Sequence, residues 1–195
     1  MATWNGICAA SADDAKEASG TVTLADTPNI LLSAGTHWAG LRFPGCPVAN
    51  SEPIVSAVLT LELVAGNTDP GALVFYGEAA DNAAAFTTAA SNISGRTRTA
   101  ANVPWSSGAL GGGDKASPDL AAILAEITSR PGWAAGNAVA LILDATATTS
   151  LRFTSYDSST TLCARLVVEY GGGQPAVIRG RFVPGMGRPH IQQGW

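Results

Sequence analysis

The stretch SPDLAAILAEITSRPGWAAGNAVALILD, residues 117–144, contains a complete helix signal followed by a strand, and it decides the fold class. Ser117, Pro118 and Asp119 are typical of a helix start, because they supply an N-cap oxygen, a residue without a backbone donor and a carboxylate at the positive end of the dipole. The apolar residues that follow recur at i, i+3, i+4 and i+7; they are Leu120, Ile123, Leu124 and Ile127. This spacing predicts an amphipathic helix over about residues 118–130 with one buried face.

Short strand signals surround this helix. The apolar run at 137–144 is too short for an independent helix and is flanked by turn residues, so it predicts a core strand. Further strands are predicted at 21–26, 30–33, 38–43, 54–64, 72–76, 151–156 and 164–170. The clearest is 54–64, where small and polar Ser56, Thr60 and Glu62 alternate with Val55, Leu59, Leu61 and Leu63, which predicts one buried and one wetter face. A hairpin is predicted to join this strand to 72–76.

Two other segments complete the expected core and loops. Val103 and Trp105 lie in a polar stretch and are predicted to contact the core. The sequence GALGGGDKAS, residues 108–117, is predicted to be a flexible loop before the helix.

Composition supports the same fold class. The 195 residues are 46% hydrophobic and only 13% charged, with 22 Gly and 11 Pro, and the β-favouring runs recur between turn signals. These properties predict a mainly β protein, an all-β sandwich with one minor helix. We expect one domain over residues 1–170 and a Gly/Pro-rich, basic, extended C-terminal arm over residues 171–195.

Charge and cysteine content narrow the class of function. The formal net charge of −4 and a pI near 5.0 give no reason to expect nucleic acid as a partner, since phosphate binding needs a basic surface. No stretch approaches the roughly 20 apolar residues of a membrane helix, and the first residues lack the pattern of a signal peptide, so we expect a protein made in a cytoplasm. Cys8, Cys46 and Cys163 are predicted to be buried free thiols, with a Cys8–Cys46 bridge as the alternative.

The C-terminal arm has a charge opposite to that of the rest of the chain. It carries three arginines and no acidic residue, so it is +3, whereas the remaining eight basic and fifteen acidic residues give −7. Such a segment cannot form a core alone. We expect it to bind an acidic body, that of a neighbouring subunit, with packing onto its own domain as the alternative. The residues predicted to make this contact are Ile178, Arg179, Arg181, Phe182, Arg188 and Trp195.

Catalytic chemistry has little support in the sequence. Nucleophilic catalysis usually needs a histidine base, and the chain has only His37 and His190, of which the second lies in the arm. Arg42 alternates with Leu41 and Phe43, so we expect it to point away from the core and to form an ion pair with a carboxylate. We therefore expect no enzyme; a hydrolase with an unrecognised site is the weakest alternative.

A series of motifs, in order along residues 13–170, resembles the DNRLRE-type β-sandwich domain. This family is related to carbohydrate-binding modules and occurs in bacterial surface proteins and bacteriophage structural proteins. The motifs are DDAKE, GLRF, IVSAVLTLEL, GEAADNAAAF, ISGRTRT, VPW, SPDLAAILAEITSRPGWAAGNAVALIL, SYD and ARLVVEY. They cover about four-fifths of the chain, and their order is more specific than any one of them. The resemblance implies a jelly-roll-like antiparallel β-sandwich with one helix at its side and no catalytic activity.

The resemblance also implies where function would lie. With no signal peptide and no attached enzyme domain, we expect a virion component of a tailed bacteriophage or related particle, such as a head decoration protein. It would be homo-oligomeric or bound to other virion proteins. The alternative is a carbohydrate-binding module that attaches to glycans, with stacking by Trp4, Trp38 and Tyr156.

A structural calcium ion is a further expectation, because related sandwiches often hold one and calcium takes carboxylate oxygens. The candidate ligands are Asp13, Asp14, Glu17, Glu78, Asp81 and Asp157. The alternative is that these acids are solvated or form ion pairs with Arg42 or Arg96.

Overall fold

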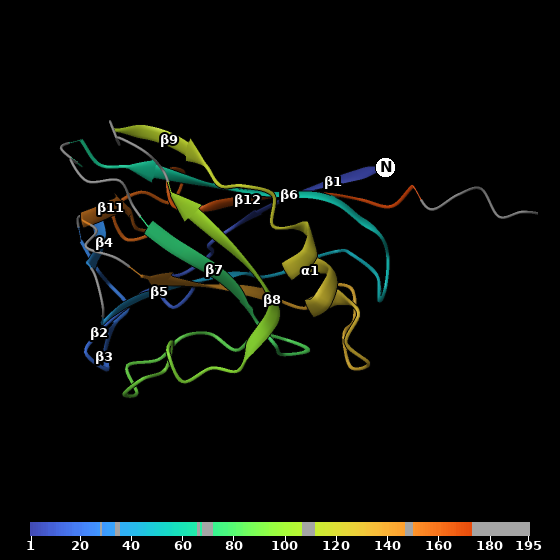
Figure 1. Ribbon diagram of the computed structural model, residues 1–195, viewed down its shortest axis with the longest axis horizontal. Coiled ribbons are helices and arrows are strands. Elements are labelled where there is room, and N and C mark those ends of the chain that lie inside the picture. Colours follow the sequence, from blue (N-terminus) through green and yellow to red (C-terminus); the bar gives the residue numbers. More distant parts are fainter. Residues whose placement is uncertain are drawn as a thin grey trace, which may run out of the picture.

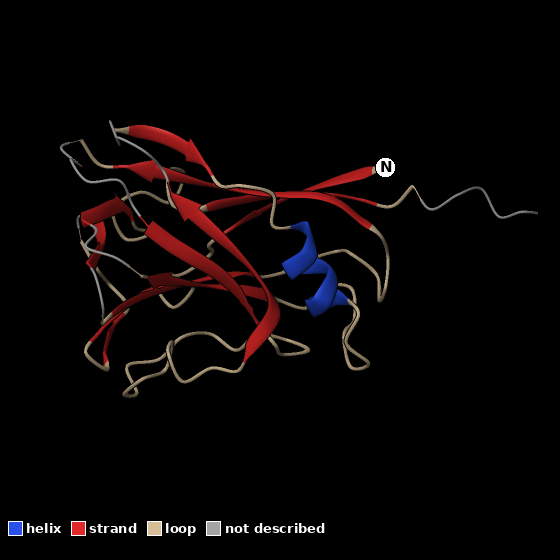
Figure 2. Ribbon diagram, in the orientation of Figure 1, coloured by secondary structure: helices blue, strands red, loops and turns tan. Residues whose placement is uncertain are grey.

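Two antiparallel β-sheets pack face to face as a β-sandwich, with one short helix beside them (Figures 1 and 2), which confirms the predicted mainly β class. The structure is a computed structural model that describes residues 1–27, 29–33, 36–65, 67, 72–106, 112–146 and 150–172. Sheet A contains β1 (Ala2–Ile7), β12 (Arg165–Tyr170), β6 (Ile54–Leu63), β11 (Ser150–Thr154) and β4 (Asn29–Ser33), with β9 (Gly113–Ala116) also paired to β6. Sheet B contains β3 (Thr21–Thr23), β2 (Asp14–Ala18), β5 (His37–Phe43), β10 (Val139–Ala145), β7 (Ala72–Glu78) and β8 (Arg98–Ser106).

Consecutive strands repeatedly change sheets, as in a jelly roll. The chain passes from sheet A to sheet B between β4 and β5 and again between β6 and β7. The predicted hairpin between β6 and β7 is therefore wrong, because β7 pairs with β8 and β10 while β6 pairs in the other sheet. Alternation along a strand specifies which face is buried, but it does not specify the neighbouring strand.

The main core lies between the sheets. Leu59, Leu61 and Leu63 of β6 pack in the same buried cluster as Leu141 and Leu143 of β10. The partly buried Val103 and Trp105 of β8 pack against this cluster, as predicted. The alternation of β6 is thus confirmed over its second half.

Val55 is the exception in β6. It was expected on the buried face, but 43% of it is exposed. The pairing of β6 with β12 shifts register here: Glu169 lies opposite Ser56 and Tyr170 lies opposite Ile54. Val55 is therefore the extra residue of a bulge, and it does not follow the alternation of buried and exposed residues.

The helix α1 (Ala121–Thr128) is shorter than predicted, and its predicted start is wrong. The Ser117 hydroxyl accepts a hydrogen bond from the backbone N–H of Leu59 at 3.0 Å instead of capping the helix. The Asp119 carboxylate accepts from the N–H groups of Ala57 at 2.8 Å and Ala121 at 3.0 Å. Residues 117–120 therefore continue along the free side of β6, and the helix begins only after them.

The apolar stripe of the helix is confirmed. Leu120, Ile123, Leu124 and Ile127 are all buried. Helix α1 contacts β6 of one sheet and β7 and β8 of the other, so it covers one side of the sandwich. The approach to β7 is close at Gly77, where a Cβ atom would lie 2.7 Å from the Ile127 Cδ1.

Four strands, β1, β2, β8 and β9, were not predicted. The most informative is β9, which lies inside the predicted flexible loop and pairs with residues 60–63 of β6. Its Gly-rich sequence gives no strand signal of its own, so pairing to β6 decides its conformation. Among the described residues, no helix has the length and apolar character needed to cross a membrane.

Candidate interaction surface

The outer face of sheet B is covered by residues 79–97, the loop that joins β7 to β8 and that we call the cover loop (Figure 1, green, below the sheet). In β10 the odd-numbered residues face the main core, whereas Ala138, Ala140 and Ile142 belong to a second buried cluster. Phe86 and Ile93 of the cover loop complete that cluster. Both faces of β10 are consequently buried.

Phe86 makes the closest contact between the cover loop and the sheet. A Cβ atom at Gly40 of β5 would lie 2.3 Å from the Phe86 Cζ. Any side chain at position 40 would therefore displace the ring. Gly40 belongs to the GLRF motif, and this contact gives a physical reason for glycine there.

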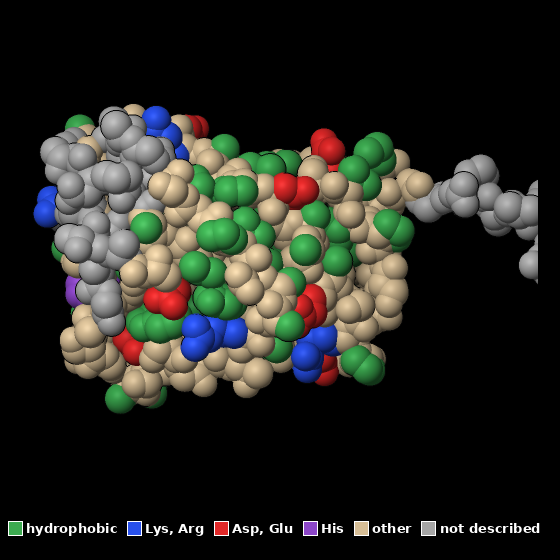
Figure 3. All heavy atoms as spheres, in the orientation of Figure 1, with side chains coloured by type: hydrophobic (Ala, Val, Ile, Leu, Met, Phe, Trp, Pro, Cys, Tyr) green, Lys and Arg blue, Asp and Glu red, His purple; other side chains and the backbone are tan. Residues whose placement is uncertain are grey.

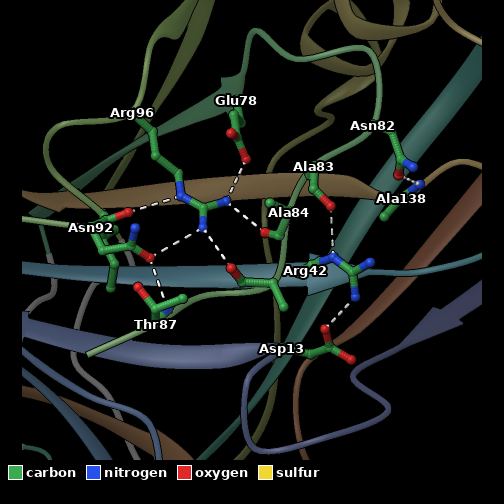
Figure 4. Close-up of polar contacts among 12 residues, drawn as sticks. Asp13, Arg42, Glu78, Asn82, Ala83, Ala84, Thr87, Asn92, Arg96 and Ala138 are labelled. Atoms are coloured by element: carbon green, nitrogen blue, oxygen red, sulfur yellow. Dashed lines mark hydrogen bonds and ion pairs between the residues drawn. The ribbon is translucent and has the colours of Figure 1, made fainter. Parts of the chain in front are cut away.

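The Arg96 side chain binds several groups of the cover loop and its flanking strand (Figure 4). Its Nη1 lies 2.6 Å from the Glu78 Oε2 and donates to the Ala84 carbonyl at 2.8 Å, and its Nε donates to the Asn92 carbonyl at 2.8 Å. Its guanidinium also lies 4.1 Å from the centre of the Phe86 ring. Because the Arg96 side chain is only 9% exposed, these contacts are shielded from water and hold the loop in one conformation.

Arg42 and Glu17 supply two more attachments. The Arg42 Nη1 lies 2.6 Å from the Asp13 Oδ1, and its Nε donates to the Ala83 carbonyl at 2.8 Å (Figure 4). The buried Glu17 carboxylate accepts from the backbone N–H of Ile93 at 2.9 Å. The expected ion pair of Arg42 with a carboxylate is thus confirmed.

The six predicted calcium ligands are not brought together. Three of them, Asp13, Glu17 and Glu78, serve the attachments above; Asp81 pairs with Arg130 at 2.7 Å, and Asp157 accepts from a serine hydroxyl at 2.5 Å. In the described parts of the chain, no three His, Cys, Asp or Glu side chains are grouped as a metal site would need. The alternative, ion pairs to Arg42 and Arg96, holds for two of the six.

The sixth acid, Asp14, is buried without a cation. It is 1% exposed and accepts a hydrogen bond from the Tyr156 backbone N–H at 2.5 Å, while its Oδ1 has no hydrogen-bond partner among the described residues. Burial raises the pKa of Asp14 to about 7; the bond from Tyr156 opposes this shift, and the carboxylates of Asp157, Asp13 and Asp26 add to it. Asp14 is therefore protonated over much of the range in which other carboxyls are charged.

All three cysteines are buried and free, as predicted, and the alternative bridge between Cys8 and Cys46 is not formed. Cys8 instead shares a hydrogen bond with Cys163, which together with burial raises the pKa of Cys8 well above its ordinary value. The two residues come together because Cys8 follows β1 and Cys163 precedes β12, its paired strand.

The three predicted glycan-stacking residues lie in different places and pack inward. Trp4 and Tyr156 are partly buried against the main core. Trp38 packs against the second cluster, and the Arg98 guanidinium lies 4.8 Å from its ring centre. The six predicted contact residues of the arm lie outside the described residues.

The outer face of sheet A contrasts with that of sheet B. The described residues form two buried clusters, the main core between the sheets and the cluster under the cover loop. Neither cluster covers the outer face of sheet A. Ile7 of β1 is 38% exposed there, although it is aliphatic. Figure 3 shows another side of the molecule, where hydrophobic side chains also reach the surface among few charged ones.

A groove of about 320 Å³ crosses this face near one end of β1, β12, β6 and β9. It is lined by Asn5, Gly6, Ile7, Thr60, Asp114, Arg165, Leu166 and Val167. The lining therefore combines aliphatic side chains, two neutral polar side chains and one pair of opposite charges.

The charged end of the groove has more acid than base. Arg165 forms an ion pair with Asp114, and Glu62 lies opposite Asp114 in the β6–β9 pairing. A hydrogen bond with Asp114, followed by burial and the Asp114 charge, raises the pKa of Glu62, while Arg165 acts in the other direction. Two carboxyl groups thus share one guanidinium.

Sequence reasoning did not single out Ile7, Asp114 or Arg165. They come from strands far apart in the chain. The only sequence signal for this outer face of sheet A was the set of polar residues in β6. No protein-family model and no curated protein matches the chain, so the resemblance to DNRLRE-type domains stays an expectation.

Proposed function

We infer that this protein is a non-enzymatic assembly subunit that binds neighbouring proteins through the outer face of sheet A. The observation that supports this function is the difference between the two outer faces. The cover loop buries one of them under Phe86 and Ile93, whereas the other keeps a groove with the half-exposed Ile7 and a charged end. A groove lined by aliphatic side chains and a charged pair can accept the side chains of a partner protein.

The resemblance stated above supports a virion setting. A head decoration protein or other accessory component of a tailed bacteriophage must bind copies of itself or other virion proteins, and it needs no catalytic centre. The arm, +3 against −7 for the rest of the chain, is the part that would connect one subunit to the next. Assembly would then follow synthesis in the host cytoplasm.

The test of this function is assembly. The full-length protein should self-associate with rising concentration in sedimentation velocity experiments, or bind purified particles, and imaging of such particles should locate it. A protein that remains monomeric at every concentration and binds no particle would contradict the proposal.

A second candidate, glycan attachment, has one observation in its favour. The Arg98 guanidinium lies 4.8 and 5.0 Å from the ring centres of Trp38 and Tyr76, and its Nη1 is 3.9 Å from the Asp144 Oδ2. Aromatic rings beside a carboxylate and a guanidinium can bind a sugar, if the arginine moves off the rings. A glycan screen in which Trp38→Ala abolishes a saturable signal, with Tyr156→Phe as the matched control, would favour this function over assembly.

A further inference from the structure

The charged end of the sheet A groove has one cation, Arg165, for two carboxyl groups. Asp114 is 57% exposed, and its only ion pair among the described residues is with Arg165, which Glu62 also approaches. A second guanidinium at this place would separate the two carboxyl groups and relieve their repulsion. The groove thus favours a ligand that brings an arginine.

The other part of the groove favours an aliphatic or aromatic side chain beside that arginine. Ile7 and Val167 lie in neighbouring strands and both line the groove. A ligand that fits both parts is a short extended peptide with a cation and an apolar side chain a few residues apart.

The arm of this chain contains such a peptide. Residues 178–182, Ile-Arg-Gly-Arg-Phe, place two arginines between two large apolar residues, and the arm carries no acid. The glycine between the arginines allows a close approach to the sheet. Charge complementarity, +3 against −7, acts in the same direction.

The direction of the chain indicates which copy supplies the peptide. β12 begins at Arg165 in the groove and runs away from it, and the Gly171 N–H donates to the Pro53 carbonyl at 2.9 Å at the far end of the sheet. Figure 1 shows this exit beside the N-terminus, whereas β9 lies at the opposite side of the view. The described chain thus ends away from its own groove, which favours a neighbour's groove as the site that receives the arm.

We propose that residues 178–182 of one copy bind in the sheet A groove of a second copy, with an arginine of the segment against Asp114 and Glu62 and an apolar residue against Ile7. This inference rests on the proposed assembly function and names the surface and the partner. It makes the assembly a head-to-tail one, in which each copy gives an arm and receives one. Residues 173–177, the five residues between the described chain and this segment, span at most about 17 Å when extended, so the proposal requires the two copies to lie close together.

The test is a charge exchange between two full-length variants. In the groove variant, Glu62→Lys and Asp114→Lys are combined; in the arm variant, Arg179→Glu and Arg181→Glu are combined. Each variant alone should associate about ten-fold or more weakly than the wild type, because like charges then meet. In an equimolar mixture both types of contact pair opposite charges again, so association should return to within about three-fold of the wild type.

Two controls protect the result. Circular dichroism melts of each variant should match the wild type. The neutral groove variant Glu62→Gln with Asp114→Asn should also associate more weakly, and mixing it with the arm variant should restore only the contact between its own arm and the arm variant's groove. A wild type that self-associates but is insensitive to both double variants would overturn this docking surface and leave the assembly function standing. A monomeric wild type would overturn the second-copy arrangement, and failure to bind particles as well would overturn the assembly function.

Discussion

Strands β10 and β6 lie in the centres of the two sheets and have opposite outer faces. Every residue of β10 from Val139 to Leu143 is buried, because the cover loop packs on the side that the main core leaves free. In β6 only alternate residues are buried, and Thr60 and Glu62 remain on a face with a groove. The difference shows that one outer sheet face of this protein is covered by its own chain, whereas the other keeps polar side chains and a groove.

The substitution Phe86→Ala should have the largest effect among the tests of this comparison. Removing the ring leaves a cavity over Gly40 and exposes the second cluster, so we expect the free energy of unfolding to fall by about 4 kcal/mol. The matched change on the other face, Ile7→Ala, should cost less than about 1 kcal/mol, because Ile7 is already 38% exposed. Urea denaturation of both variants measures the difference. Similar losses at the two positions would mean that the faces do not differ in coverage.

The second test concerns the buried carboxyl group of Asp14, which should make the stability of the folded protein depend on pH independently of the two outer faces. With a pKa of about 7 in the folded state and 3.8 as the ordinary value, Asp14 keeps its proton in the folded protein while the unfolded chain loses it. Stability should therefore fall as pH rises from about 4 to about 7 and stay low above that. Asp14→Asn should remove this fall and be about 2 kcal/mol more stable at pH 8. Denaturation curves at pH 5 and pH 8 measure it; an unaltered pH dependence in the variant would contradict the assignment.

The third test changes the open face without changing the core. Ile7→Glu should alter the free energy of unfolding by no more than about 0.5 kcal/mol but weaken self-association by about ten-fold, because it places a charge in an apolar part of the groove. Leu162→Glu is the matched control, since Leu162 is 43% exposed and does not line the groove. Sedimentation equilibrium measures both. If the two variants associate equally well, the face is not the interface.

The smallest expected effect is that of salt. Raising NaCl from 0.05 to 0.5 M should weaken self-association a few-fold by screening the charges of the arm and the body. The melting temperature should change little, since the ion pairs of the cover loop are shielded. Salt-insensitive association would identify Phe182 and Trp195 as the main contacts of the arm.

The sequence predicted the fold class well and did not predict the surface that we propose for assembly, for a physical reason. Local periodicity predicted the buried stripe of α1 and the buried face of β6, because burial repeats every 3.6 or 2 residues, and a continuous apolar run predicted β10. It did not reveal β9 or the start of the helix, since the Ser117 hydroxyl binds β6 instead of the first helical turn and the Asp119 carboxylate binds both. Arg42 could be predicted to need a carboxylate, but its partner Asp13 is 29 residues away.

What the sequence by itself determined is a mainly β chain with one amphipathic helix, a net negative body and a basic arm. The tertiary structure alone decided which acids pair with which arginines, that Cys8 lies beside Cys163, and that β9 and β12 place Asp114 and Arg165 at one end of a groove. Periodicity and composition are local properties, whereas strand order depends on which buried faces fit together across the whole sandwich. The surface that we propose for assembly is a product of that order.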